Sequence, residues 1–163
     1  MSIKTPEFMG YFLDFSAEVT GFSRFDLEGT RQADLYFDTV LKMVGEDIFG
    51  ELLTIFHDLD KRAKKKYDPV ILSEGLRSQI LESSKRGPVA RNIIKLWYTA
   101  NWYELPDAWE AWYGAGQEKN SHFIPSPQSY PEGLVWKAIG VNPPGAKGAG
   151  YGTWSEPPSV SLS

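Results

Sequence analysis

The apolar residues of the first hundred positions recur at intervals of three and four, which is the spacing of one face of an α-helix. The first apolar stripe covers residues 8–19, follows Thr5 and Pro6 and stops at Gly21. A threonine before a proline favours a helix start, because the hydroxyl caps a free backbone N–H and proline has none to cap. The pattern therefore predicts a first helix that ends before Gly21.

Two more stripes follow, over residues 33–44 and 48–59. Thr30 is expected to cap the first of these helices, and Gly45 is expected to end it. The second begins almost at once and finishes in a basic run at 61–66. Cations at the C-terminal end of a helix complement its macrodipole, so the basic run is expected to mark that end. Contact with anionic lipid headgroups or with an acidic protein surface is the alternative interpretation of the run.

Asp68 and Pro69 repeat the combination of cap and proline and predict a fourth helix that runs towards Gly87. Pro88 then opens a fifth helix. Nothing in this region alternates with period two for long enough to form a strand. The sequence predicts an all-α fold, a small bundle of about five helices over residues 5–103.

Beyond residue 103 prolines and glycines interrupt every helical window. A turn at 107–113 and a short helix at 131–139 are the regular elements expected there. Large rings are nevertheless concentrated in this part, since all six tryptophans lie in the last 67 residues together with eight of the eleven prolines. So many rings are not left in water. We expect residues 1–163 to form one domain, whose irregular tail at 104–163 lies partly on the helices and partly on a partner.

The tail aromatic residues are the candidate partner-binding residues, because tryptophan and tyrosine dominate interface hot spots. Trp97 is expected to lie in the core instead, since it continues the apolar stripe of the fifth helix. The candidates are Trp102, Tyr103, Trp109, Trp112, Tyr130, Trp136, Tyr151 and Trp154.

The net charge of -4 argues against a nucleic-acid partner, because no excess of cations exists to neutralise phosphates. The absence of cysteine excludes disulfides and thiolate metal sites. The sequence has no run of 18 apolar residues, so it does not predict a membrane span. These properties are typical of a chain that folds in water.

No catalytic or cofactor-binding motif is present, and the two histidines do not form one. His57 lies beside Asp58 and near Asp60, a spacing that does not converge on one metal ion in a helix, so we expect it to be packed or solvated. The glycines of 145–152 follow no strand and predict a turn or a docking segment, not a phosphate site. An independent enzyme and a carbohydrate-binding module, whose rings would stack on sugars, remain the alternatives.

Three groups of strings occur in order along the chain. They are FSAEVTGF at 15–22 leading to Gly29-Thr30, IIKLWY at 93–98 with NWY at 101–103, and YPEGLVW at 130–136 with PPG at 143–145 and GTWSEPP at 152–158. With these strings the chain resembles the small (gamma) subunit of bacterial membrane-associated FAD-dependent sugar and alcohol dehydrogenases, such as sorbitol, fructose and glucose dehydrogenase complexes.

The resemblance implies that this chain is not an enzyme and holds no cofactor or metal itself. The FAD and the chemistry would belong to a large catalytic subunit, and a multi-haem cytochrome c subunit would pass electrons on where it is present. The small subunit of that family supports the stability, maturation and export of the large one. A periplasmic chain held at the membrane only through its partners is therefore expected, with a cytoplasmic relative as the alternative because no twin-arginine leader is present. Association would be non-covalent, since cysteine is absent.

Overall fold

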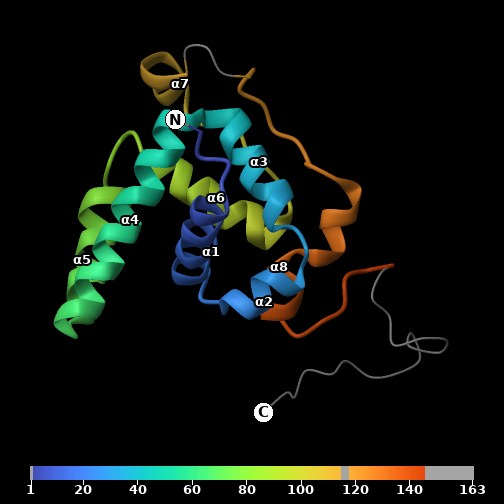
Figure 1. The fold of residues 1–163 in the computed structure, drawn as a ribbon. Helices are drawn as coiled ribbons and strands as arrows, with labels where there is room; N and C mark the ends of the chain where they lie inside the picture. The colour runs from blue at the N-terminus through green and yellow to red at the C-terminus, as the bar shows by residue number, and fades with distance from the viewer. Residues whose placement is uncertain (1, 115–117, 146–163) are drawn as a thin grey trace.

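The structure is a computed structural model that describes residues 2–114 and 118–145 (Figure 1). Those residues form eight α-helices, one π-helical stretch and one 3₁₀ helix, and their one β-type contact is the isolated bridge between Trp102 and Phe123. The all-α prediction is confirmed. The elements are α1 Pro6–Thr20, α2 Arg24–Gly29, α3 Ala33–Val44, α4 Glu46–Lys66, α5 Pro69–Gly75, η1 (π) Leu76–Leu81, α6 Gly87–Thr99, α7 Asp107–Tyr113, η2 (3₁₀) Pro127–Glu132 and α8 Leu134–Ala138.

The predicted boundaries of α1 are confirmed. The Thr5 hydroxyl accepts a hydrogen bond of 3.3 Å from the N–H of Phe8, and Gly21 follows the helix with a left-handed φ of 78°. Glycine suits this position because the absence of a Cβ removes the clash that a left-handed conformation causes. The Thr5 cap and the Gly21 stop thus define the two ends of a helix whose apolar face the sequence had already predicted.

Helix α2 was not predicted, and the cap assigned to Thr30 is wrong. Ser23 caps α2 by accepting a hydrogen bond of 3.1 Å from the Asp26 N–H. Thr30 follows α2, where its hydroxyl donates to the Leu27 carbonyl at 2.7 Å, and α3 begins after Gln32 without a side-chain cap. A six-residue helix that buries only Leu27 shows no apolar periodicity, so the pattern could not reveal it.

The predicted fourth helix begins where expected but changes type. Asp68 caps α5 by accepting a hydrogen bond of 3.0 Å from the Val70 N–H. After Gly75 the helix continues as the π-helical η1, and α6 starts at Gly87 with proline in its first turn. A π-helical stretch inside a helix is uncommon, and propensity alone does not predict it.

Helix α1 lies at the centre of the bundle and contacts α3, α4 and α6 (Figure 1). The ring of Phe12 is the meeting point, with centroids 5.6 Å from Phe37, 5.7 Å from Phe49 and 6.0 Å from Trp97. Edge-to-face and offset ring pairs of this kind add to the free energy gained by burial. Trp97 has no exposed surface, so the prediction that it belongs to the core is confirmed.

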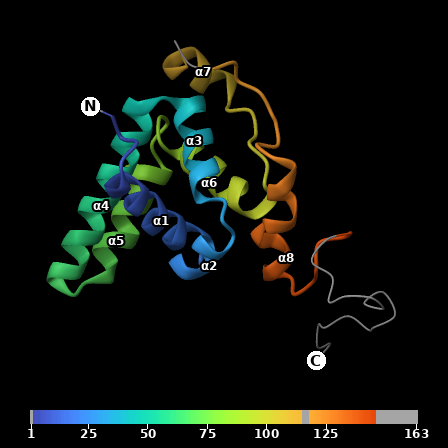
Figure 2. The same ribbon diagram turned by 45° about the vertical axis from the view of Figure 1, so that its right-hand side comes forward.

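The described part of the tail packs on the bundle. The turn expected at 107–113 is the helix α7, and the expected short helix is η2 followed by α8, which contacts α6. Leu105, Trp109 and Leu134 belong to the same hydrophobic core as the N-terminal helices. Figures 1 and 2 show α7 at one end of the molecule and α8 beside α2 at the other. Of the helices described, none is both long and apolar enough to span a membrane.

Candidate partner-binding site

The structure divides the predicted partner-binding residues by exposure. Trp102 has no exposed surface and Trp109 is 3% exposed, which corrects the expectation that these two rings are presented to a partner. Trp102 is buried because its backbone bridges to Phe123 through two hydrogen bonds of 2.9 Å and turns the indole into the core. The sequence shows that a ring lies outside a periodic helix but not which way it faces.

Trp112 is 80% exposed and Tyr130 is 40% exposed, whereas Tyr103 and Trp136 are half-buried. Trp136 packs edge to face on Tyr130 with ring centroids 5.5 Å apart, and its indole N–H donates to the Tyr130 carbonyl at 3.1 Å. Tyr103 stacks on His122 at 4.6 Å. These four remain candidates. Tyr151 and Trp154 lie outside the described residues.

Among the described tryptophans the most exposed is Trp112 of α7, which lies beside a groove of about 500 Å³ that we call the α7 groove. Its lining is mostly apolar, but the hydroxyl groups of Ser84 and Tyr113 meet there at 3.1 Å. Apolar walls with one polar pair are typical of sites that combine affinity with orientation. The groove is lined by Ser84, Pro88, Pro106, Ala108, Trp109, Trp112 and Tyr113.

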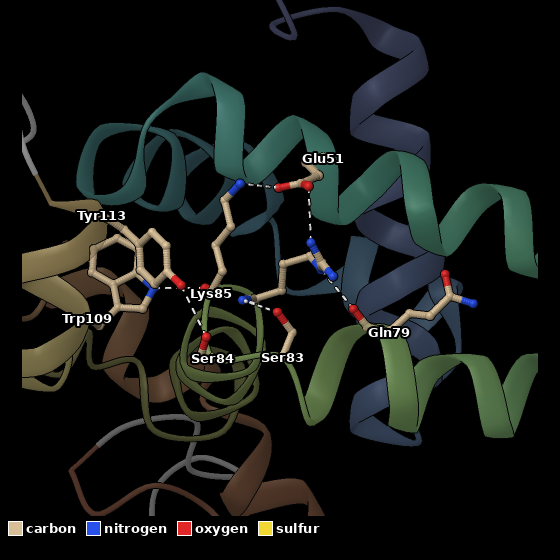
Figure 3. A network of polar contacts seen from close by, with 8 residues as sticks. Glu51, Gln79, Ser83, Ser84, Lys85, Trp109 and Tyr113 are labelled. Carbon is tan, nitrogen blue, oxygen red and sulfur yellow. Dashed lines mark hydrogen bonds and ion pairs between the residues drawn. The ribbon is translucent and has the colours of Figure 1, made fainter.

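A polar network holds α7 against the bundle (Figure 3). Glu51 of α4 accepts ion pairs from Lys85 at 2.8 Å and from Arg86 at 3.1 Å, so the segment between η1 and α6 is fixed to α4. The Arg86 side chain also donates to the Gln79 carbonyl at 2.8 Å. The Trp109 indole N–H then donates to the Lys85 carbonyl at 2.8 Å. These contacts tie α7 to the segment before α6 and, through that segment, to α4.

A second groove, the α2–α8 groove, has a volume of about 530 Å³ and is bordered by Phe25, which is 83% exposed. Lys137 of α8 pairs with Asp26 of α2 at 2.6 Å, and both residues line the groove. Hydrogen bonds from Lys137 and then Ser23 lower the pKa of the Asp26 carboxyl. Sequence reasoning missed Phe25, because a single aromatic residue in an unrecognised helix gives no signal of its exposure.

Both histidines are packed on tyrosine rings, in agreement with the expectation for His57. Its ring lies 3.9 Å from that of Tyr11 in a stacked arrangement. His122 stacks on Tyr103, and its Nε2 lies 3.0 Å from the Asn101 side-chain oxygen. Within residues 2–114 and 118–145 no three acidic or histidine side chains are grouped so that they could hold a metal ion.

Comparison of the chain with protein-family models, with curated proteins and with solved structures finds no match.

Proposed function

We propose that this chain is the non-catalytic small subunit of a heteromeric FAD-dependent sugar or polyol dehydrogenase. It stabilises the large flavoprotein subunit and assists its maturation and export. The observation that carries the proposal is the surface of α7, where Trp112 is 80% exposed on a helix that Trp109 and Glu51 hold in place. Any cytochrome subunit would join through the large subunit, and the complex would reside in the periplasm.

The exposure of Trp112 favours a protein partner. Burying a tryptophan removes up to about 250 Å² from water, and tryptophan is enriched among residues that contribute most to interfaces. Because α7 is already fixed to the bundle, little conformational freedom is lost when a partner covers the ring. Trp112 is therefore suited to be an anchor of the interface.

The α2–α8 groove offers a second surface for the same partner. Residues 130–136, one of the strings that carry the resemblance, form the end of η2 and the start of α8, and most of them line the groove. Phe25 borders it from α2. Aromatic surfaces at two ends of the molecule suit a small subunit that contacts a much larger one over a broad area.

Co-expression with the cognate large subunit tests the proposal. We expect the large subunit to be soluble, loaded with FAD and active only when this chain is present. Trp112→Ala should weaken the complex about 30-fold, which corresponds to about 2 kcal/mol. Tyr67→Ala removes another exposed ring, which lines neither groove, and should leave the affinity unchanged. A large subunit that is fully active without this chain would refute the proposal.

Carbohydrate binding at the α7 groove is the second candidate function, favoured by the exposed indole of Trp112 beside the Ser84 and Tyr113 hydroxyl groups. Aromatic faces stack on sugar rings, and hydroxyl groups orient them. Titration of the isolated chain with sugars and polyols, followed by tryptophan fluorescence, distinguishes this function. A response that Trp112→Ala abolishes would favour it over the subunit role.

A further inference from the structure

Positive charge is concentrated where α4 turns into α5, at the end of a helical hairpin. Five cations of this turn are exposed and two carboxylates lie within it, while Asp14 and Glu18 of α1 also interact electrostatically with Lys64. Asp60 pairs with Lys64 at 2.6 Å, and Asp68 caps α5. The whole chain has a net charge of -4, so this tip is a cationic site on an acidic protein. The cations are Lys61, Arg62, Lys64, Lys65 and Lys66.

Stabilisation of α4 explains only part of this charge. The interaction between a cation and the helix macrodipole is confined to the last turn, where Lys64, Lys65 and Lys66 lie. Lys61 and Arg62 precede that turn. Like charges crowded on one helix end also repel one another, so the cluster has a cost for folding. The extra cations are better explained by an anionic surface outside the chain.

Tyr67 stands at the apex of the hairpin and is 94% exposed. Its φ of 52° places it in the left-handed region, where glycine or asparagine is the favoured residue and a bulky side chain is disfavoured. Val70, 52% exposed, lies three residues further on. Contacts within the described chain therefore do not explain an aromatic residue at this position.

We propose that the tip formed by residues 61–70 binds the surface of an anionic phospholipid bilayer. The ammonium and guanidinium groups would contact lipid phosphates, while the Tyr67 ring enters the headgroup region, which favours rings with one polar end. The tip ends in the exposed ring of Tyr67, which suits a deformable surface better than a folded acidic protein. This binding belongs to the chain alone and does not depend on the proposed subunit role.

The placement of the tip leaves the aromatic grooves accessible. Figures 1 and 2 show the end of the α4–α5 hairpin directed away from α7 and separate from α8. A chain resting on a bilayer through Tyr67 would therefore present Trp112 to the aqueous phase.

Flotation of the isolated chain with lipid vesicles tests the proposal. We expect recovery on phosphatidylcholine vesicles that contain a quarter phosphatidylglycerol, little recovery on pure phosphatidylcholine, and loss of binding as salt is raised. The double variant Lys61→Gln/Lys65→Gln should reduce the partition coefficient about 25-fold, or about five-fold for each cation. Lys42→Gln/Lys119→Gln changes the net charge equally at exposed positions outside the tip and should bind like the unaltered chain.

Tyr67→Gly distinguishes a loss of binding from a loss of folding, because the substitution should change stability and vesicle binding in opposite directions. Glycine relieves the left-handed conformation and should raise the melting temperature, while loss of the ring should weaken vesicle binding several-fold. Arg31→Gly is the matched control, since Arg31 also has a left-handed φ, of 59°, and is exposed outside the tip. It should raise the melting temperature with little change in binding.

Equal recovery on the two kinds of vesicle would overturn the proposal. So would retention of the chain on immobilised polyglutamate, lost in the double variant, without any binding to vesicles. That second result would assign the tip to an acidic protein surface.

Discussion

The indole N–H of Trp109 donates a hydrogen bond of 2.8 Å to the backbone carbonyl of Lys85, which ties α7 to the segment that leads into α6 (Figure 3). Trp112 lies three residues further along the same helix and is 80% exposed. One tryptophan of α7 thus fixes the helix to the bundle, and the other remains available for contact.

Trp109→Phe should lower the free energy of unfolding by about 1 to 2 kcal/mol, because it leaves the Lys85 carbonyl without its donor and reduces the packed volume. Trp112→Phe should change it by less than about 0.5 kcal/mol, because the Trp112 ring is mostly in water. Urea denaturation of both variants measures the difference. Equal losses of stability in the two variants would contradict the conclusion that Trp109 fixes α7 while Trp112 does not.

Gly21→Ala should destabilise the protein by about 1 to 2 kcal/mol, since Gly21 has a φ of 78° that a residue with a Cβ adopts only at a cost. Apart from the two neighbouring residues of the chain, no atom lies within 4 Å of a Cβ added there, so strain of the backbone is the expected cause. Gly29 is equally open but lies within α2 without a positive φ. Gly29→Ala should stabilise by about 0.5 kcal/mol, because it restricts the unfolded chain. Thermal unfolding followed by circular dichroism distinguishes the two signs.

Gly75→Ala should lower the free energy of unfolding by about 1 to 3 kcal/mol, because an added Cβ would come within 2.3 Å of the Leu59 side chain where α5 crosses α4. Gly10→Ala is the control inside another helix, where the nearest atom is 3.9 Å away. It should stabilise by about 0.5 to 1 kcal/mol through helix propensity. Denaturant unfolding of the two variants measures both effects. An unchanged free energy of unfolding for Gly75→Ala would show that α5 can move away from α4 without loss of stability.

The ion pair of Asp26 and Lys137 should make the docking of α8 on α2 dependent on pH. Its partners lower the pKa of Asp26 in the folded chain, so the stability it contributes is present above the unfolded pKa and is lost as the pH falls through the folded value. The difference in stability between the unaltered chain and Lys137→Gln should therefore shrink between about pH 5 and about pH 2. A part that does not vary with pH should persist, because Lys137 also lies over the Phe22 ring at 5.9 Å. A difference that is constant over this range would contradict the assignment.

Local signals were sufficient for the long helices. An apolar face that repeats every three to four residues, a cap such as Thr5 and a stop such as Gly21 act over neighbouring positions, so they can be recognised without a structure. The same reasoning places Trp97 in the core, because the ring continues an apolar stripe. Helix α2 was not predicted, because a single buried leucine gives no apolar periodicity.

The orientation of the tail aromatic residues was decided by contacts between distant segments. Trp102 and Trp109 lie in the core, where a backbone bridge to Phe123 holds the first and a hydrogen bond to the Lys85 carbonyl holds the second. Trp112, on the same seven-residue helix as Trp109, faces water. All three residues are tryptophans, so their hydrophobicity and their helix propensity are the same. Burial depends on which elements meet in three dimensions, so only the packed chain separates a core tryptophan from one that is free to anchor a partner.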